Sequence, residues 1–323
     1  MAPPNRLLLI DINVLGFSAM RQWAYMDLSH EGRATGAIQG TLDKLLALTA
    51  ERPGHVPVVL WDDRCHWREQ ILPAYKRHRW ESPEQRAMLE SYLAQAEVVG
   101  ELLAHLGLPQ IFCPGFEADD LAGAIVRHCD PDWEIVLATS DTDWLQALRP
   151  NVLWVSPATG QRVTLADLAD PEKVKGGPFL STDHYVQAKA LAGDTSDGIP
   201  GVEGVGLKTA AKILREQGSV EALWARHDAG VPIKGAILQR AAGRGAREMY
   251  YRNLRLIDWR LAPALPGDHR VRVEAPDHDA YRERCTAWGL THRRAPAAVA
   301  MTGEAGAPAV EAIRRMLAAA AAG

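Results

Sequence analysis

The sequence is poor in cysteine and has no long apolar run. Its four cysteines lie far apart and form no Cys-x-x-Cys pair; they are Cys65, Cys113, Cys129 and Cys285. This spacing argues against a zinc site or a disulfide framework and is typical of reduced thiols. The apolar stretches are too short to cross a membrane, and the first residues lack the charged-then-apolar pattern of a secretory signal. We therefore expect a cytoplasmic protein with no membrane contact.

The chain also lacks the excess of basic residues that nucleic-acid-binding proteins usually carry. Its formal net charge is −4 over 323 residues. Nine of its acids, however, stand in short acidic motifs or at the ends of apolar runs: Asp11, Asp62, Glu117, Asp119, Asp120, Asp141, Asp143, Asp194 and Asp197. If bound cations neutralise these nine acids, the remaining formal charge is +5.

Basic residues are concentrated in two segments. Between Arg64 and Arg79 there are five Lys or Arg residues against one acid, and between Gly206 and Arg247 there are eight against three. Either run alone is also compatible with a solvated helix face. Because the two runs flank the acidic motifs, together they favour a track for a phosphate backbone.

The positions of the nine acids point to metal binding. Most of them end or follow an apolar run that should be buried, and buried carboxylates are unfavourable unless a cation gathers them. Mg²⁺ and Mn²⁺ prefer oxygen ligands. Two such ions in a site made of carboxylates are a usual arrangement for phosphodiester cleavage.

The order of apolar segments predicts the fold class. Strands are expected at 7–10, 56–61, 109–113 and 133–138, with a hairpin at 152–155 and 162–165, and helices at 36–50, 84–106 and 117–129. This alternation predicts an α/β fold with a parallel sheet covered by helices on both faces. In such sheets ligands bind beyond the carboxyl ends of the strands, where Asp11, Asp62 and the pair Asp141 and Asp143 lie.

Composition divides the chain into three regions. Residues 1–180 form the α/β core, with a basic and aromatic segment at about 64–90. Residues 181–290 form a helical region. Residues 291–323 are rich in Ala, Pro and Gly and are expected to be a mobile tail with one helix at about 310–317.

Several acidic motifs have a simpler explanation that must be weighed. Asp11 alone is explained equally well as a helix cap at a strand end. Of the adjacent Asp62 and Asp63 only one can point inward, and we expect Asp62 to do so. The acids of segment 117–120 open a helix, where the helix dipole favours them, although three acids in four residues exceed what capping needs.

Two further acid pairs are closely spaced. The carboxylates of Asp141 and Asp143 repel each other unless a cation bridges them. Asp194 and Asp197 are three residues apart, and we expect them to share one face of a helical turn.

The glycine-rich stretch 201–209 superficially resembles a phosphate-binding P-loop. Leu207, however, separates the last glycine from Lys208, and no strand precedes the stretch. It therefore favours a helix–hairpin–helix whose backbone N–H groups approach DNA phosphates without reading sequence. The residues expected to take part are Gly201, Gly204, Gly206, Lys208, Thr209 and Lys212.

Segment 72–79 has the sequence Leu-Pro-Ala-Tyr-Lys-Arg-His-Arg. Aromatic rings can stack on unpaired bases while Lys and Arg hold phosphates, so Tyr75, Lys76 and Arg79 are candidate contacts. The alternative is a solvent-exposed loop anchored by one Trp.

In this order, from about Leu7 to Ile257, the motifs resemble the structure-specific 5′-nuclease family. That family includes phage flap endonucleases, 5′-3′ exonucleases and the 5′-nuclease domain of bacterial DNA polymerase I. The resemblance rests on the two Asp-ended strands, segment 72–79, Glu-Ala-Asp-Asp at 117–120, Ser-Asp-Thr-Asp-Trp at 140–144 and the Gly-Asp stretch from 193. It implies a PIN-like parallel-sheet nuclease core with a helical arch and a helix–three-turn–helix DNA-binding element.

The resemblance also implies ligands. One metal ion is expected on Asp11, Asp62, Glu117 and Asp119, with Asp120 close by, and a second on Asp141, Asp143, Asp194 and Asp197. Lys76 and Arg79 match arch residues that steer the scissile phosphate, and Tyr75 is expected to stack. Backbone carbonyls near Val202 and Val205 are expected to hold K⁺.

The implied activity is hydrolysis of DNA near 5′ ends with two Mg²⁺ or Mn²⁺ ions. The expected partners are DNA with 5′ flaps or 5′ ends and RNA–DNA hybrids, and the protein is expected to work as a stand-alone monomer in a bacterium or a phage-infected cell. Two alternatives remain: a PIN-type ribonuclease and a non-catalytic protein that binds DNA structures. The 194–209 hairpin argues against the first, and the presence of all nine acids argues against the second.

Overall fold

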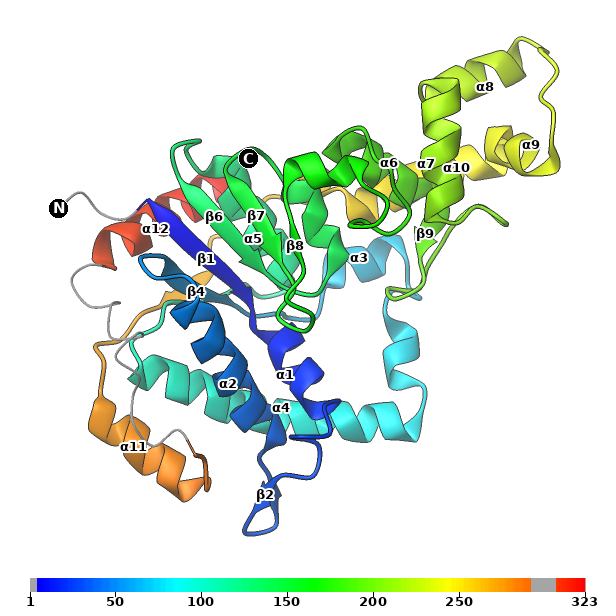
Figure 1. Cartoon of the computed structure of the whole chain (residues 1–323). Coiled ribbons are helices and arrows are strands. Elements are labelled where there is room, and N and C mark those ends of the chain that lie inside the picture. The colour runs from blue at the N-terminus through cyan, green and yellow to red at the C-terminus, as the bar shows by residue number, and fades with distance from the viewer. Residues whose placement is uncertain (1–4, 292–305, 323) are drawn as a thin grey trace.

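A seven-stranded, mostly parallel sheet forms the centre of the computed structural model, which describes residues 5–291 and 306–322 (Figure 1). The strand order is β11-β5-β4-β1-β6-β7-β8. The parallel strands are β1 (Arg6–Asp11), β4 (Val56–Leu60), β5 (Gln110–Phe112), β6 (Glu134–Ala138) and β7 (Val152–Val155). Two antiparallel strands, β8 (Arg162–Val163) and β11 (Arg270–Arg272), close its edges. The predicted α/β class with a parallel sheet is confirmed.

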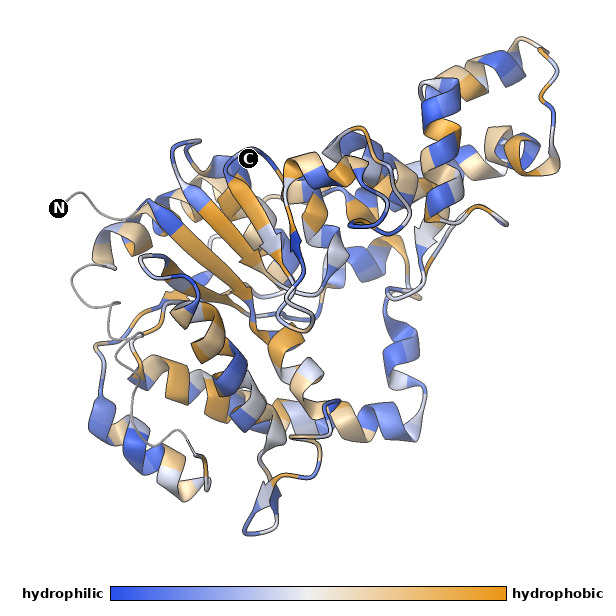
Figure 2. Cartoon of the chain, in the orientation of Figure 1, coloured by the Kyte–Doolittle hydropathy of each residue, from blue (hydrophilic) through white to orange (hydrophobic). Residues whose placement is uncertain are grey.

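Helices cover both faces of this sheet because its central strand is apolar on both sides. Successive strand residues point to opposite faces. Leu8 and Ile10 of β1 pack with α1 (Ile12–Met20), α2 (Gly36–Ala50) and α4 (Pro83–His105). Leu7 and Leu9 pack on the other face with α5 (Ala118–His128) and α12 (Ala307–Ala322). Figure 2 shows the continuous apolar colour of the central strands between these two helical layers.

Most predicted elements occur within a residue or two of their expected ends. The helix predicted at 36–50 is α2, and the helix predicted at 84–106 is α4. Helix α4 begins where Ser82 accepts a hydrogen bond from the Gln85 N–H at 3.1 Å and Pro83 occupies the first turn. The predicted hairpin is the antiparallel pair of β7 and β8.

The basic segment between β4 and α4 contains two short helices. They are α3 (His66–Ile71) and the 3-10 helix η1 (Arg77–Trp80). We call residues 64–90 the arch segment. It runs from the sheet edge past β9 to the start of α4 (Figure 1).

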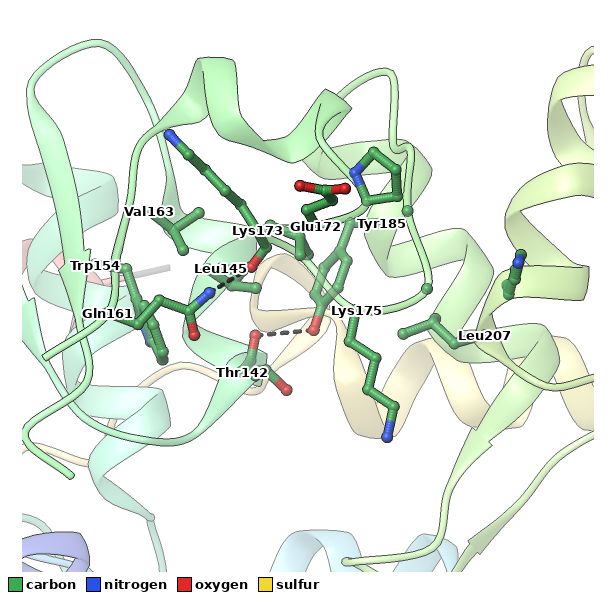
Figure 3. A pocket seen from close by; sticks show the side chains of 15 residues that line it. Thr142, Leu145, Trp154, Gln161, Val163, Glu172, Lys173, Lys175, Tyr185 and Leu207 are labelled. Atoms are coloured by element: carbon green, nitrogen blue, oxygen red, sulfur yellow. Dashed lines mark hydrogen bonds between the residues drawn. The ribbon is translucent and has the colours of Figure 1, made fainter. Parts of the chain in front are cut away.

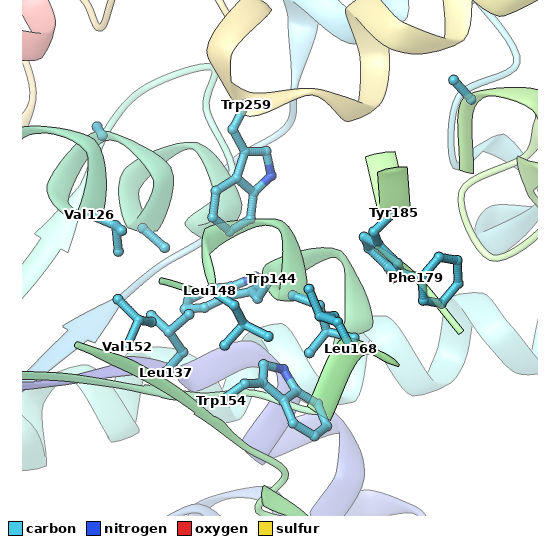
Figure 4. Packing of buried hydrophobic residues seen from close by; sticks show 14 of the residues in the cluster. Val126, Leu137, Trp144, Leu148, Val152, Trp154, Leu168, Phe179, Tyr185 and Trp259 are labelled. Atoms are coloured by element: carbon cyan, nitrogen blue, oxygen red, sulfur yellow. The ribbon is translucent and has the colours of Figure 1, made fainter. Parts of the chain in front are cut away.

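The helical region follows the sheet and projects away from it (Figure 1). It contains α6 (Thr182–Ala192), α7 (Leu207–Gln217), α8 (Val220–Asp228), α9 (Ala236–Ala242) and α10 (Arg244–Ile257), with a two-stranded hairpin of β9 (Gly193–Asp194) and β10 (Ile199–Pro200) between α6 and α7. A shared apolar core joins it to the sheet. Figure 4 shows Trp144, Trp154, Tyr185 and Trp259 in that core, which forms around the 3-10 helix η2 (Thr142–Ala147).

The remaining elements are small or peripheral. They are the hairpin of β2 (Ser29–His30) and β3 (Arg33–Ala34), the 3-10 helices η3 (Leu165–Ala169) and η4 (Trp259–Leu261), and α11 (His278–Ala287). Helix α11 packs against α4.

The end of the chain differs from the predicted mobile tail. The predicted helix at 310–317 is longer, as α12, and it is part of the core: Ala309, Ile313 and Leu317 are fully buried beside α5. The Leu265 N–H also donates to the Ala320 carbonyl at 3.3 Å. The rest of the predicted tail, 292–305 and residue 323, lies outside the described residues. Within the described ranges, no helix is long and apolar enough to cross a membrane.

Candidate active site

The strands that end in acids deliver them to one edge of the sheet. Asp11 ends β1 and also caps α1: it accepts hydrogen bonds from the Val14 N–H at 3.1 Å and the Thr139 hydroxyl at 3.0 Å. Asp62 follows β4 and accepts from the Ala118 N–H at 2.7 Å, next to Glu117. Asp63 turns elsewhere and accepts from the Gly115 N–H. The structure thus places Asp62, rather than Asp63, in the acidic cluster.

Repulsion and burial act together on the centre of this cluster. The pKa of Asp11 is well above its usual value because burial disfavours the charge and Asp62 repels it. The pKa of Asp119 is likewise raised by burial and then by Asp141. Burial also raises the pKa of Asp141, although Lys189 and Lys76 oppose that shift. A bound cation would offset both the burial and the repulsion that disfavour the ionised forms of these carboxylates.

Basic side chains of the arch segment face the same acids. Lys76 Nζ donates to Glu117 Oε1 at 2.6 Å and lies 3.6 Å from Asp197 Oδ2. Arg79 donates to Asp197 Oδ1 at 2.9 Å. Burial opposes ionisation of Glu117, but Lys76 and Arg68 outweigh it and hold its pKa below the usual value. Lys76 has a φ of 51°, a left-handed conformation that is rare outside glycine and recurs at functional sites.

The second acidic group is held by a lysine of α6. The ammonium of Lys189 is buried, donates to Asp143, and donates to Asp194 Oδ2 at 2.6 Å. Burial opposes ionisation of Asp194, yet Lys189 keeps its pKa below the usual value. Asp197 differs: burial raises its pKa in spite of the attraction of Lys76.

The donor atoms of this site fit hard divalent metals. Among the described residues no three His, Cys, Asp or Glu side chains converge tightly enough to form a ready metal cage. Lys76 and Lys189 instead lie between the acids, with their ammonium groups on carboxylates. The donor atoms are nevertheless carboxylate oxygens, and five of these acids have raised pKa values that a bound cation would lower: Asp11, Asp62, Asp119, Asp141 and Asp197. This chemistry matches Mg²⁺ or Mn²⁺.

Asp120 does not face the cluster, although the sequence placed it there. Its carboxylate makes a bidentate pair with the buried Arg68, at 2.8 and 2.9 Å, and also accepts from the Glu117 N–H at 3.0 Å. Arg68 donates in addition to Glu117 Oε2 at 3.0 Å. Both oxygens of Asp120 are therefore used in orienting Glu117 and Arg68.

Tyr75 differs from its predicted role as a stacking residue. Its ring is buried, and its hydroxyl donates to Glu117 Oε2 at 2.7 Å and lies 3.1 Å from Asp197 Oδ2. The ring therefore has no free face for a base. Its hydroxyl links the acid after β5 to the acid in the β9–β10 hairpin.

The β9–β10 hairpin differs from the helical turn that was expected for Asp194 and Asp197. Asp194 and Asp197 do not share a helical face: Asp194 lies in β9, opposite Ile199, and Asp197 lies in the connecting turn. Gly193 and Gly198 have φ values of 72° and 70°, which break the helix. The Lys76 N–H donates to the Asp197 carbonyl at 2.8 Å, so the arch segment is joined directly to this turn.

The glycine-rich stretch 201–209 connects this hairpin to the start of α7. A side chain at Gly201 would meet the Ala192 carbonyl, so this glycine allows close packing. Gly206 precedes α7 without a side-chain cap and has no atom near the place of a Cβ. Lys208 and Lys212 are exposed and Thr209 is half-buried. Val202 and Val205 have buried side chains, and the Val205 N–H donates to the Val202 carbonyl at 2.9 Å.

Comparison with protein families identifies the family to which the chain belongs. The model of the 5′-3′ exonuclease N-terminal resolvase-like domain matches residues 6–176, and that of the 5′-3′ exonuclease C-terminal SAM fold matches residues 180–260. The chain belongs to the 5′-3′ exonuclease family.

Similar proteins include an exonuclease and a DNA polymerase. A 5′-3′ exonuclease of Mycobacterium tuberculosis is 32% identical over 211 residues, covering 61% of this chain and 66% of that protein. The thermostable DNA polymerase I of Thermus thermophilus is 33% identical over 228 residues, covering 70% of this chain but 26% of the polymerase. The chain therefore matches about two thirds of the first relative's length and a quarter of the second's.

Solved structures agree on the fold. The bacteriophage T5 flap endonuclease, in a pseudo-enzyme-product complex with DNA and metal ions, aligns with a TM-score of 0.65 over 97% of this chain and 99% of that chain, at 21% identity. The T5 5′-exonuclease has also been solved with divalent zinc ions. At this identity the similarity establishes the shared exonuclease fold.

Two buried cations beside these acids were not predicted from the sequence. Arg68 was counted only in a basic run, and Lys189 was not considered. A signal existed for Lys189: it stands in the segment Tyr-Val-Gln-Ala-Lys-Ala-Leu-Ala at 185–192, where a lone Lys on a largely buried helix needs an acidic partner.

A cleft lies beside the acids rather than among them. It has a volume of about 570 Å³ and lies between η2, the β7–β8 hairpin, the loop 171–177 and the start of α7 (Figure 3). Tyr185 crosses it and donates to the Thr142 carbonyl at 2.9 Å. None of the nine acids lines this cleft.

Proposed function

We propose that this chain is a metal-dependent 5′-3′ exonuclease and flap endonuclease that hydrolyses DNA phosphodiesters near 5′ ends. The observation that carries the proposal is the meeting of two kinds of charge at one sheet edge. Asp141 repels both Asp11 and Asp119 there, and the arch segment brings Lys76 to the same place. Such a site is suited to gathering divalent ions against a phosphate.

The acids are assigned to two metal ions as the family resemblance implies. Asp11, Asp62, Glu117 and Asp119 would hold one Mg²⁺ or Mn²⁺ ion, and Asp141, Asp143, Asp194 and Asp197 a second. When bound, these ions supply an activated water and stabilise the leaving oxygen. Asp120 is left out of both groups because Arg68 occupies its oxygens. The turn carbonyls near Val202 and Val205 would hold K⁺.

The arch segment supplies positive charge for the substrate. Lys76 now donates to Glu117, and a scissile phosphate drawn between them would compete for the same ammonium group. Its charge would then stabilise negative charge that develops on the phosphate. Arg79 is half exposed and holds Asp197, which places a second cation on the solvent side of Lys76.

The helix–hairpin–helix would grip the duplex next to this site. Free backbone N–H groups at the start of α7 and the exposed Lys208 and Lys212 face solvent together. Contacts of this kind bind the phosphate backbone and carry no sequence information. The expected substrates are therefore DNA structures, namely 5′ flaps, 5′ ends and RNA–DNA hybrids, and the expected working form is a monomer without an obligate protein partner.

The deciding experiment compares a 5′-labelled flap DNA with a blunt duplex, each in Mg²⁺ and in EDTA. Release of an intact flap oligonucleotide in Mg²⁺ supports flap endonuclease action, and mononucleotides from the blunt duplex support exonuclease action. Asp141→Asn should lose cleavage, whereas Asp63→Asn, which changes an acid outside the cluster, should keep it. Binding without cleavage in Mg²⁺ or Mn²⁺ would instead favour a non-catalytic DNA-binding protein.

A further inference from the structure

Helix α9 contacts the glycine-rich stretch 201–209 at Gly204. Gly204 has a φ of 77°, and a Cβ placed there would lie 3.1 Å from Arg240 Nη2 and 3.8 Å from Ile237 Cγ1. Arg240 Nη1 lies 3.5 Å from Glu203 Oε2. A guanidinium group from α9 therefore stands beside the turn that leads into α7.

The ion pair of Arg240 and Glu203 does little for the fold. The two side chains are 42% and 86% exposed, and solvent weakens such a pair to a small contribution. Two other arginines of the helical region pair with acids on its helices α8 and α10. Arg247 binds Asp228 on α8, and Arg244 binds Glu248 on α10. Among these, Arg240 is the guanidinium whose acidic partner lies on the glycine-rich stretch.

Arg240 lies beside the surface that is proposed above to bind the phosphate backbone of DNA. The start of α7 is open at Gly206, and Lys208 is exposed in the first turn of that helix. Arg240 lies next to Gly204, two residues before Gly206. A guanidinium group can make two parallel hydrogen bonds to a phosphate, which a lysine cannot.

We propose that Arg240 is a phosphate contact for duplex DNA and that Glu203 is its counter-ion in the free protein. DNA would replace Glu203 on the guanidinium, so Glu203 limits affinity while Arg240 raises it. The inference rests on the proposed function and extends the duplex grip from α7 to α9. It assigns α9 to holding the duplex at a distance from the acids, where no bond is cut.

The test is a salt series of duplex binding, measured by fluorescence anisotropy in EDTA so that no cleavage occurs. Each phosphate contact contributes about 0.9 to the slope of log affinity against log salt. Arg240→Ala should lower that slope by about 0.9, so its affinity loss is about three-fold larger at about 50 mM than at about 200 mM salt. Arg240→Lys should keep the slope and lose only part of the affinity, because the charge remains.

Arg244→Ala is the matched control, since it removes the same group from the same lobe. It should leave the slope near the wild-type value. Glu203→Gln should raise duplex affinity, and this gain should vanish in the double variant with Arg240→Ala. Circular dichroism of each variant checks that α9 remains folded.

The possible outcomes distinguish the role of Arg240 from the proposed nuclease function. If Arg240→Ala and Arg244→Ala have the same slope and affinity while the wild type still cuts DNA in Mg²⁺, the role of Arg240 is wrong and the nuclease stands. If Arg240→Ala loses cleavage of saturating substrate but not binding, the assignment is equally wrong. A wild-type protein that neither binds duplex DNA nor cuts it overturns both proposals.

Discussion

Lys76 donates to Glu117 at 2.6 Å from a backbone held in the left-handed region, with a φ of 51°. The contact joins the arch segment to the acid that follows β5. Its neighbours complete the link, because Tyr75 binds Glu117 and Asp197, and the Lys76 N–H donates to the Asp197 carbonyl. The arch segment and the β9–β10 hairpin thus meet through Tyr75, Lys76 and Arg79.

The first prediction concerns this lysine. Lys76→Ala should slow single-turnover flap cleavage in Mg²⁺ by about 100- to 1000-fold, the range for removing one charge-stabilising donor. Duplex affinity should change little, because α7 supplies the proposed grip. Arg77→Ala is the control: Arg77 is the next residue along the chain and is exposed. Equal rates for the two variants would show that Lys76 serves only to hold Glu117.

The second prediction concerns Lys189. Lys189→Met should lower the free energy of unfolding by about 3 kcal/mol in EDTA, because it leaves Asp143 and Asp194 without their buried partner. The loss should be smaller in Mg²⁺, since a divalent ion can replace the missing charge. Urea unfolding in the two buffers measures both values.

Lys212→Met provides the control for Lys189, because Lys212 is exposed on α7. It should change the unfolding midpoint little in either buffer. If Lys189→Met destabilises the protein equally with and without Mg²⁺, its side chain acts through packing, and the proposed link to the metal-binding acids is wrong.

The third prediction is a pH dependence of stability. Asp11, Asp119 and Asp141 have raised pKa values in the folded protein. The folded protein therefore keeps protons that the unfolded chain has released above about pH 4. These groups make the free energy of unfolding in EDTA fall as the pH rises through their folded-state pKa values. Bound Mg²⁺ favours the ionised forms and should oppose that fall.

Unfolding midpoints measured at about pH 5 and about pH 8, with Mg²⁺ or EDTA, test this dependence. The stabilisation by Mg²⁺ should be larger at the higher pH. Asp119→Asn should gain on the order of 1 kcal/mol in EDTA at the higher pH while losing cleavage, because it removes repulsion and keeps an acceptor for the Trp144 N–H. A destabilised Asp119→Asn variant would contradict the repulsion inferred here.

The sequence specified the framework of the site better than its contacts. Asp11 and Asp62 follow apolar runs, and a parallel sheet brings the ends of such runs to one edge. Local pattern was enough for this. Asp194 and Asp197 were placed on a helix because their spacing suits one, but Gly193 and Gly198 take positive φ values and form a hairpin.

Other contacts depend on residues far apart in the chain and left no local sign. Asp120 turns toward Arg68, 52 residues away, because α3 buries that guanidinium behind α5. Tyr75 is buried where its hydroxyl meets Glu117 and Asp197, which are 42 and 122 residues away in the chain. A pattern of residue types shows which groups carry charge, whereas the fold decides which of them meet.

The fourth prediction follows from α12, whose alanine-rich sequence suggested a mobile tail. Leu317 is fully buried against the layer that contains α5, so Leu317→Ala should lower the free energy of unfolding by about 2 to 5 kcal/mol. Arg314→Ala, on the exposed face of α12, should have little effect, and urea unfolding compares the two. Because α5 carries Asp119 in its first turn, Leu317→Ala should also weaken the apparent affinity for Mg²⁺ in the cleavage assay. Equal midpoints for the two variants would mean that α12 adds nothing to the core.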